Sequence, residues 1–265
     1  MKLIPSRKTP EQRTGEMTVV EHLQELRRRI IICVWAVAIS GIAAWFLYGP
    51  FKNALRKPYC EFVAQNPQNA STNGCDLVVT GPIDPMMVKL KIVLFIAVAI
   101  ALPVLLYQLW AFIVPGLTAR EKKWSIPFVL TSFFLFMMGA AFAYYTLPRA
   151  LGFLLGFAGP GVVSLLTFDR YVSFVMLVAL AFGLSFLLPI LLVFLELVGV
   201  VSPQWLSKNR RYSIFLIFLF AAIITPSSDP YTMTAMAVPM YLLYEAAIIV
   251  GRLAKRGQKT DQATD

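Results

Sequence analysis

Acidic residues are the candidates for chemistry in this sequence, because they are few and several lie within or beside long apolar runs. The 265 residues include 14 Asp and Glu against 24 Lys and Arg. A carboxylate can accept two hydrogen bonds from one guanidinium, so an acid held in place can bind a basic partner. Glu196 and Glu245 lie inside apolar runs, where ionisable residues are usually functional or paired within the helix bundle. Near a helix end, either could instead reach water or a basic loop.

Glu25 lies in a short amphipathic segment, residues 18–29. Thr18 and Glu21 fit a capping box at its start, and apolar residues then recur at helical spacing. The pattern predicts an interfacial helix with Glu25 on its polar face. There Glu25 is either a solvated charge supported by Arg29 one turn later or an acidic site for a basic partner.

Glu121 and Asp229 lie in turns between apolar runs. Glu121 follows Thr118 at capping-box spacing, just after a Pro-Gly pair that ends the preceding helix. Capping therefore explains Glu121 on the residues alone, and a binding role is the alternative. Asp229 lies in the turn that begins at Thr225, where turn formation and helix capping account for an Asp.

Catalytic and metal-binding patterns find little support. His22 is the sole histidine and has no cysteine cluster near it in the sequence, which argues against a metal site. The chain contains no HExxH, no GxSxG and no Gly-rich phosphate loop. We therefore expect no enzyme, no metal and no cofactor, and an intramembrane enzyme remains an alternative that lacks a catalytic constellation.

The elements that position these acids must be membrane helices. Hydrophobic residues make up 58% of the chain and charged residues 14%, and the mean hydropathy is +0.70, which excludes a soluble globular domain. The sequence predicts an all-α integral membrane protein with a membrane domain at 18–252 between disordered polar tails at 1–17 and 253–265. Six transmembrane helices are expected at about 30–48, 92–114, 125–147, 171–201, 212–224 and 231–250. The fifth and sixth are expected to be short spans, and the fifth covers only about 20 Å against an apolar membrane core of about 30 Å.

Positive charge sets the expected orientation. Most Lys and Arg residues fall in the N-terminal tail, the loops after the second and fourth runs, and the C-terminal tail. Cytoplasmic loops carry this excess, so both termini are predicted to be cytoplasmic in a multi-pass protein of the cell membrane. The net charge of +10 is read in the same way, and not as a sign of nucleic-acid binding.

The longest loop, residues 49–91, is turn-rich and faces outward in this topology. It contains Cys60 and Cys75, which could form a disulfide if that compartment is oxidising. Asp84 followed by Pro85 predicts the start of the second helix. Pro189 is expected to kink the long fourth run.

Several short motifs occur in order along the chain. They are His22-Leu23-Gln24-Glu25-Leu26-Arg27-Arg28-Arg29, Tyr107-Gln-x-Trp-x-Phe-x-x-Pro-Gly-Leu, Glu121-Lys122, Ala181-Phe-Gly-x-Ser-Phe186, the Thr225-Pro226 turn with Asp229, and Val238-Pro-Met-Tyr241 leading to Glu245. With these motifs, the chain from about Val19 to Arg252 resembles the TatC family, the multispanning receptor subunit of the twin-arginine protein translocase.

The resemblance implies a function. TatC proteins bind signal peptides that carry paired arginines and, with small single-span partners of the TatA/TatB type, move folded proteins across the membrane in an oligomeric complex. The proton-motive force drives transport, and the complex uses no nucleotide. Glu25 and Glu121 match the two cytoplasmic acids that receive the arginine pair. Other positions that the family uses for structure or activity match Arg27, Pro58, Phe112, Asp229 and Glu245.

The sequence departs from the family pattern at two positions, Leu187 and Met233. Leu187 stands where family members often carry an acid or amide, and Glu196 follows nine residues later, on nearly the opposite helix face. Met233 stands where a polar residue helps a partner helix to dock, although Thr225 is retained. The alternative from another class is a small-solute secondary transporter, which would need a pair of interrupted helices that the sequence does not show.

Overall fold

The structure is a computed structural model that describes residues 19–66, 74–113, 125–157, 166–197, 199–225 and 229–262. These ranges hold eight α-helices and no β-strand, so the all-α prediction is confirmed. The helices are α1 (Val19–Gln65), α2 (Asp84–Ile113), α3 (Ser125–Gly156), α4 (Phe168–Ser185), α5 (Leu188–Leu197), α6 (Pro203–Lys208), α7 (Arg210–Ile224) and α8 (Pro230–Gln262). The predicted tail at 1–17 lies outside the described residues.

Five of the helical segments are long and apolar enough to cross a membrane. They are Val20–Gln65, Asp84–Phe112, Ile126–Gly156, Phe168–Glu196 and Pro230–Leu253. The segment predicted as a short fifth span is α7, whose 15 residues measure about 22 Å.

Helix α8 extends beyond the predicted sixth span of 231–250 at both ends. The apolar part of α8 runs over 24 residues, and the helix then continues to Gln262 through part of the expected disordered tail. Asp229 caps its start, and its polar end is rich in Lys, Arg and Gln, which are good helix formers.

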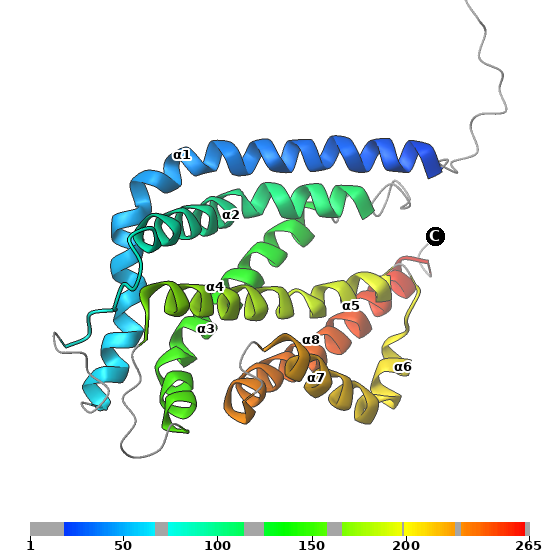
Figure 1. Ribbon diagram of the computed structural model, residues 1–265. Coiled ribbons are helices and arrows are strands. Elements are labelled where there is room, and N and C mark those ends of the chain that lie inside the picture. Colours follow the sequence, from blue (N-terminus) through cyan, green and yellow to red (C-terminus); the bar gives the residue numbers. More distant parts are fainter. Residues whose placement is uncertain are drawn as a thin grey trace, which may run out of the picture.

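The first 17 residues of the predicted outer loop are also helical. They extend α1 to Gln65, with Pro50 and Pro58 inside the helix. Proline bends a helix because it removes a backbone donor and clashes with the preceding turn. In Figure 1 the second part of α1 turns away from the first and runs down beside the start of α4 toward the end of α3.

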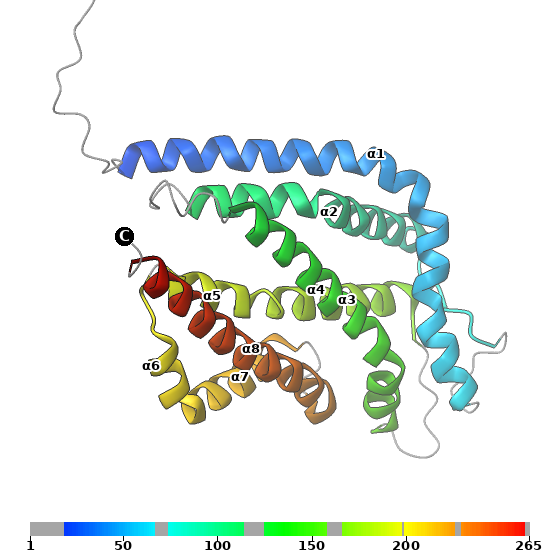
Figure 2. The same ribbon diagram turned by 180° about the vertical axis from the view of Figure 1, so that it is seen from behind.

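The predicted kink in the fourth run is confirmed as a break between α4 and α5. The last residue of α4, Ser185, donates its hydroxyl to the Ala181 carbonyl at 2.7 Å. Pro189, at the second position of α5, has no N–H with which to continue the α4 ladder. After the break, α5 continues along nearly the same line as α4 toward the end of the molecule where α1 begins (Figures 1 and 2).

The helices group their ends at two opposite sides of the molecule. The start of α1 and the ends of α2, α5 and α8 lie at one side, and the second part of α1 and the starts of α2 and α4 lie at the other (Figures 1 and 2). We call these the α1-start side and the cap side. This grouping brings the first turns of α1 beside the last turns of α2.

The cap side is tied together by covalent and polar contacts. Cys60 and Cys75 form a disulfide with an S–S distance of 2.08 Å, and Arg56 pairs with Asp76. Val78 bridges to Thr167 at the entry to α4. Two hydrogen bonds continue this pattern. The Tyr144 hydroxyl donates to the Ala54 carbonyl at 2.8 Å in an exposed contact, and the Tyr171 hydroxyl donates to the Leu55 carbonyl at 2.7 Å in a buried one.

Helices α3 and α4 cross at positions occupied by glycine. A Cβ on Gly139 of α3 would lie 2.7 Å from the Phe182 carbonyl oxygen of α4. A Cβ on Gly183 of α4 would lie 2.7 Å from the Phe136 ring of α3. Each helix therefore places a glycine against a phenylalanine position of the other, which allows the close backbone approach that membrane helices favour.

Candidate functional site

Glu25 lies near the start of α1 in contact with α2. Its Oε1 accepts two hydrogen bonds from Arg29, one from Nε at 3.1 Å and one from Nη2. Arg29 Nη1 donates to Oε1 of Gln108 on α2, also at 3.1 Å. The Glu25 and Arg29 side chains are only 21% and 19% exposed, so this is a partly buried ion pair joined to a second helix.

A ring contact next to the ion pair joins the same two helices. The His22 and Phe112 rings stack with their centroids 4.4 Å apart and their planes at 22°. Since the sequence prediction included Glu25 and Phe112, the structure brings two of the predicted residues to one place. Glu121, the second predicted acid, lies outside the described residues.

Arg27 lies apart from Glu25 on the helix surface. Two residues along an α-helix correspond to a rotation of about 200°, so the two side chains leave α1 on different faces. Arg27 is exposed and lines a shallow hollow with Gln24 and Arg28. The structure thus separates Arg27 from the Glu25 pair.

Pro58, Thr225 and Asp229 have structural roles in the described part of the chain. Pro58 is fully buried in the second part of α1. Thr225 ends α7 and donates its hydroxyl to the Ala221 carbonyl at 2.8 Å. Asp229 is buried and accepts the backbone N–H of Thr232 at 3.1 Å, which is the N-cap arrangement expected from the sequence.

Glu196 is buried against α8. It is 1% exposed, and its Oε2 would lie 1.7 Å from a Cβ built on Gly251. Only a glycine at that position leaves room for the carboxylate in this arrangement. Leu187 lies in the turn between α4 and α5 and packs against the apolar cluster that contains Trp110 and Phe136. The position where family members often carry an acid or amide is therefore in apolar surroundings in this chain.

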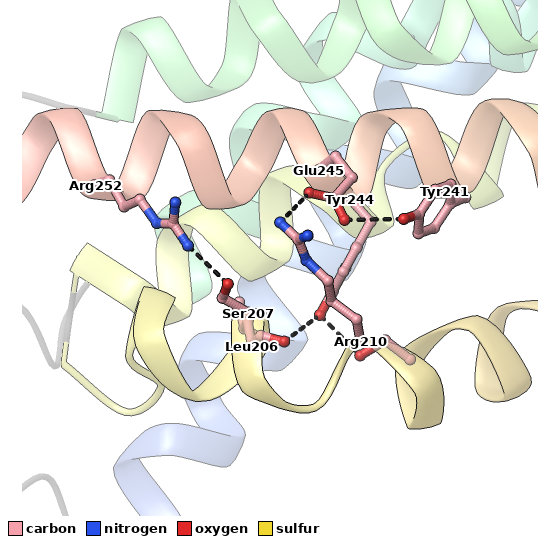
Figure 3. A network of polar contacts seen from close by, with 8 residues as sticks. Leu206, Ser207, Arg210, Tyr241, Tyr244, Glu245 and Arg252 are labelled. Atoms are coloured by element: carbon pink, nitrogen blue, oxygen red, sulfur yellow. Dashed lines mark hydrogen bonds and ion pairs between the residues drawn. The ribbon is translucent and has the colours of Figure 1, made fainter.

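Glu245 is the centre of a polar network that joins α8 to α6 and α7 (Figure 3). Its Oε2 accepts from Arg210 Nη2 at 2.8 Å, and its Oε1 accepts from the Tyr241 hydroxyl at 3.0 Å. The neighbouring Tyr244 hydroxyl donates to the Leu206 carbonyl and accepts from Ser213, both at 2.9 Å. This intramembrane acid is therefore paired, and it holds the short α7 on α8.

Replacing Glu245 by Gln is expected to loosen α7. The change leaves Arg210 with no opposite charge at this contact, and the partly exposed pair should show a coupling of about 1 kcal/mol. The measurement is thermal unfolding in detergent of the variants Glu245→Gln, Arg210→Gln and the double variant. Strictly additive losses of stability would show that the pair does not couple the two helices.

Two contacts were missed by reasoning on the sequence. Gln108 was recognised only as part of a motif, and the partner of Glu245 was not identified. Gln108 gave no signal of its own, because its role depends on a contact between two helices. Arg210 did carry a signal in the sequence. It lies just before the start of the fifth run, and Glu245 lies near the end of the sixth, which is on the same side of the membrane if the two helices are antiparallel.

The chain is similar to proteins of one family along nearly its whole length. The sequence model described as Sec-independent protein translocase protein (TatC) matches residues 21–239. A Sec-independent protein translocase protein TatC from Frankia casuarinae is 44% identical and covers 97% of this chain and 73% of its own. The same protein from Aquifex aeolicus is 41% identical, with coverage of 93% and 99%.

A solved structure agrees with the sequence matches. The crystal structure of a twin arginine translocase receptor, TatC, superimposes with a TM-score of 0.69 at 40% identity, covering 89% of this chain and 100% of that one. Its helices therefore follow the same path as those described above. On the family match, the identities and the shared fold, this chain belongs to the TatC family of Sec-independent protein translocase proteins.

Proposed function

We propose that this chain is the receptor subunit of a twin-arginine translocase and binds the arginine pair of a signal peptide at Glu25 and Glu121. The TatC family is a family of translocase components and not of catalytic enzymes. The family resemblance assigns both acids to the arginine pair. Guanidinium is the expected ligand because it stays charged and donates in a planar fork that fits a carboxylate.

The observation that carries the proposal is the geometry of Glu25. A guanidinium already engages its Oε1 in the folded chain, which supports the ability of this carboxylate to hold an arginine. The contact with Gln108 and the stacking of His22 on Phe112 hold the site on two helices. A site supported on two helices fixes the carboxylate better than a loop would.

The proposed topology is six spans in the cytoplasmic membrane with both termini inside. The five long spans become six if α7 also crosses, which requires a locally thin bilayer because α7 measures only about 22 Å. The disulfide on the cap side supports an outward orientation of that side, since disulfides persist in oxidising compartments. The arginine site on the α1-start side would then face the cytoplasm.

The proposed partners are signal peptides of folded cargo and single-span proteins of the TatA/TatB type, in an oligomeric complex driven by the proton-motive force. Thr225 and the partly buried Met233 lie where α7 meets α8, at the position where a partner helix would dock. Met233 packs among apolar residues of α3, α4, α7 and α8. Docking there would rest on apolar packing more than on hydrogen bonds.

The test is export of a folded reporter in cells that lack their own receptor. Cells with this chain and compatible partners should export a reporter whose signal carries Arg-Arg and retain one that carries Lys-Lys. Cells without the chain should retain both reporters. Export that is equal for the two signals, or independent of the chain, would refute the proposal.

Lengthening α7 is expected to impair transport more than signal binding. Four added leucines extend the helix by about 6 Å and remove the need for a thin bilayer. Export should fall several-fold while signal-peptide crosslinking persists. The matched control changes exposed Phe215 and Ile223 to Leu without adding length. Normal export by the lengthened protein would rule out a role for the thin bilayer.

A further inference from the structure

The two oxygens of the Glu25 carboxylate have different surroundings. Oε1 accepts both Nε and Nη2 of Arg29. Oε2 is buried and has no hydrogen-bond partner among the residues that the structure describes. A buried carboxylate oxygen without a donor carries an unfavourable desolvation cost, so it strongly favours any donor that arrives.

Arg29 is held from two sides. Two of its nitrogens contact Glu25 on the same helix, and the third contacts Gln108 on α2 at 3.1 Å. The guanidinium of this side chain therefore stands where the guanidinium of a bound arginine would stand. The negative charge of Glu25 is compensated within the chain before any peptide binds.

We propose that Arg29 is an intramolecular competitor for the signal-peptide arginine at Glu25, and that this competition lowers the affinity of every peptide that must displace it. The inference rests on the proposed function, in which Glu25 receives a signal arginine. It assigns to Arg29 a role in setting how strongly a peptide must bind Glu25.

The geometry offers a stepwise exchange. Once the groups that bury Oε2 move aside, an incoming guanidinium can donate to this oxygen while Arg29 still holds Oε1. It then replaces Arg29 at Oε1, and Arg29 keeps its hydrogen bond to Gln108. The exchange needs no intermediate in which the partly buried carboxylate lacks a cation.

Arginine and lysine peptides must displace the same contact. Arg29 gives Oε1 two N–H donors that lie in one plane. An incoming arginine can supply an equivalent planar pair, whereas a lysine ammonium is a compact point charge whose donors diverge. The competition weakens both peptides by the same factor, so the lysine peptide, which binds Glu25 less strongly, is left with the lower affinity.

The test compares Arg29→Gln with Arg28→Gln in the full chain, reconstituted in lipid nanodiscs. Both variants remove one positive charge from the same turn, but Arg28 is exposed and lines the hollow on the other face. Fluorescent peptides with Arg-Arg or Lys-Lys are titrated onto each. Arg29→Gln should bind the Arg-Arg peptide roughly fivefold tighter than Arg28→Gln, as expected for the loss of a modest competing ion pair. It should bind the Lys-Lys peptide with a similar gain, because both peptides displace the same contact, so the ratio between the two affinities stays the same.

A second variant, Arg29→Lys, tests the same contact with a smaller change. Arg29→Lys keeps the charge but loses the planar fork, and its affinity for each peptide should fall between those of the wild type and Arg29→Gln. Thermal unfolding checks that each variant is folded. If folded Arg29→Gln binds both peptides as Arg28→Gln does, or more weakly, Arg29 is not a competitor and the inference is wrong.

Failure of the inference can be told apart from failure of the proposed function. If the wild type does not bind the Arg-Arg peptide, or if Glu25→Gln binds it equally well, Glu25 is not the arginine site and both proposals fall. If binding depends on Glu25 but Arg29→Gln matches Arg28→Gln, only the role of Arg29 is refuted.

Discussion

Glu25→Gln is expected to weaken binding of an Arg-Arg signal peptide by roughly tenfold to a hundredfold, the loss typical of a hydrogen bond to a charged group. Glutamine keeps the size of the side chain and one carbonyl acceptor but carries no charge. The change also leaves Arg29 without its ion-pair partner, so an incoming arginine meets an uncompensated positive charge. Both effects act in the same direction.

Peptide binding to the purified receptor measures this effect, with Glu21→Gln as the matched control. Glu21 lies one turn earlier on α1 and is exposed, so its replacement removes the same charge from the same helix. We expect the control to bind within about twofold of the wild type, as is usual for a screened surface charge. Equal losses in the two variants would mean that only the overall charge of α1 matters.

Gly139→Ala is expected to destabilise the whole helix bundle. The new Cβ would lie 2.7 Å from a backbone oxygen of α4 and 2.9 Å from the Phe186 ring. Because the backbone oxygen cannot rotate away, α3 and α4 must move apart. That movement also disturbs the reciprocal contact of Gly183 with Phe136. The expected cost is about 1–3 kcal/mol, the usual range for overpacking a core.

Gly152→Ala provides the control on the same helix. A Cβ there would meet the Phe62 ring at 3.8 Å, an ordinary contact. Alanine favours a helix over glycine by up to about 1 kcal/mol, so this variant should be as stable as the wild type or more so. Thermal unfolding in detergent compares the two variants. A Gly139→Ala protein that unfolds at the same temperature as Gly152→Ala would contradict the close crossing.

The membrane class and most helices could be predicted from the sequence because they depend on local properties. Long apolar runs, the break before Pro189 and the cap at Asp229 all follow from residues near in the chain. The helical extension of α1 past residue 49 could not be predicted, because Pro50 and Pro58 indicate turns. It is stabilised by distant contacts, such as the Tyr171 hydroxyl on the Leu55 carbonyl.

The candidate site could be predicted in part for the same reason. The spacing of Glu25 and Arg29 is local, and it predicted an ion pair that the structure contains. The contacts to Gln108 and Phe112 join residues that are 79 and 90 positions apart, and they depend on how α1 and α2 pack. Local patterns hold no information on such packing. The placement of Glu121 relative to Glu25 remains a prediction.

In the proposed topology, the Cys60–Cys75 bond also reports the direction in which the newly made chain entered the membrane. Cys60 lies in the second part of α1 and Cys75 lies between α1 and α2, and they can be oxidised only after this part of the chain has been translocated. A chain inserted the wrong way round would keep both thiols in the reducing cytosol. Cys33 is a free thiol, so the test uses a Cys33→Ser variant. Alkylation of newly synthesised chains of this variant in cells should label misinserted molecules at Cys60 and Cys75 and leave correctly inserted ones unlabelled.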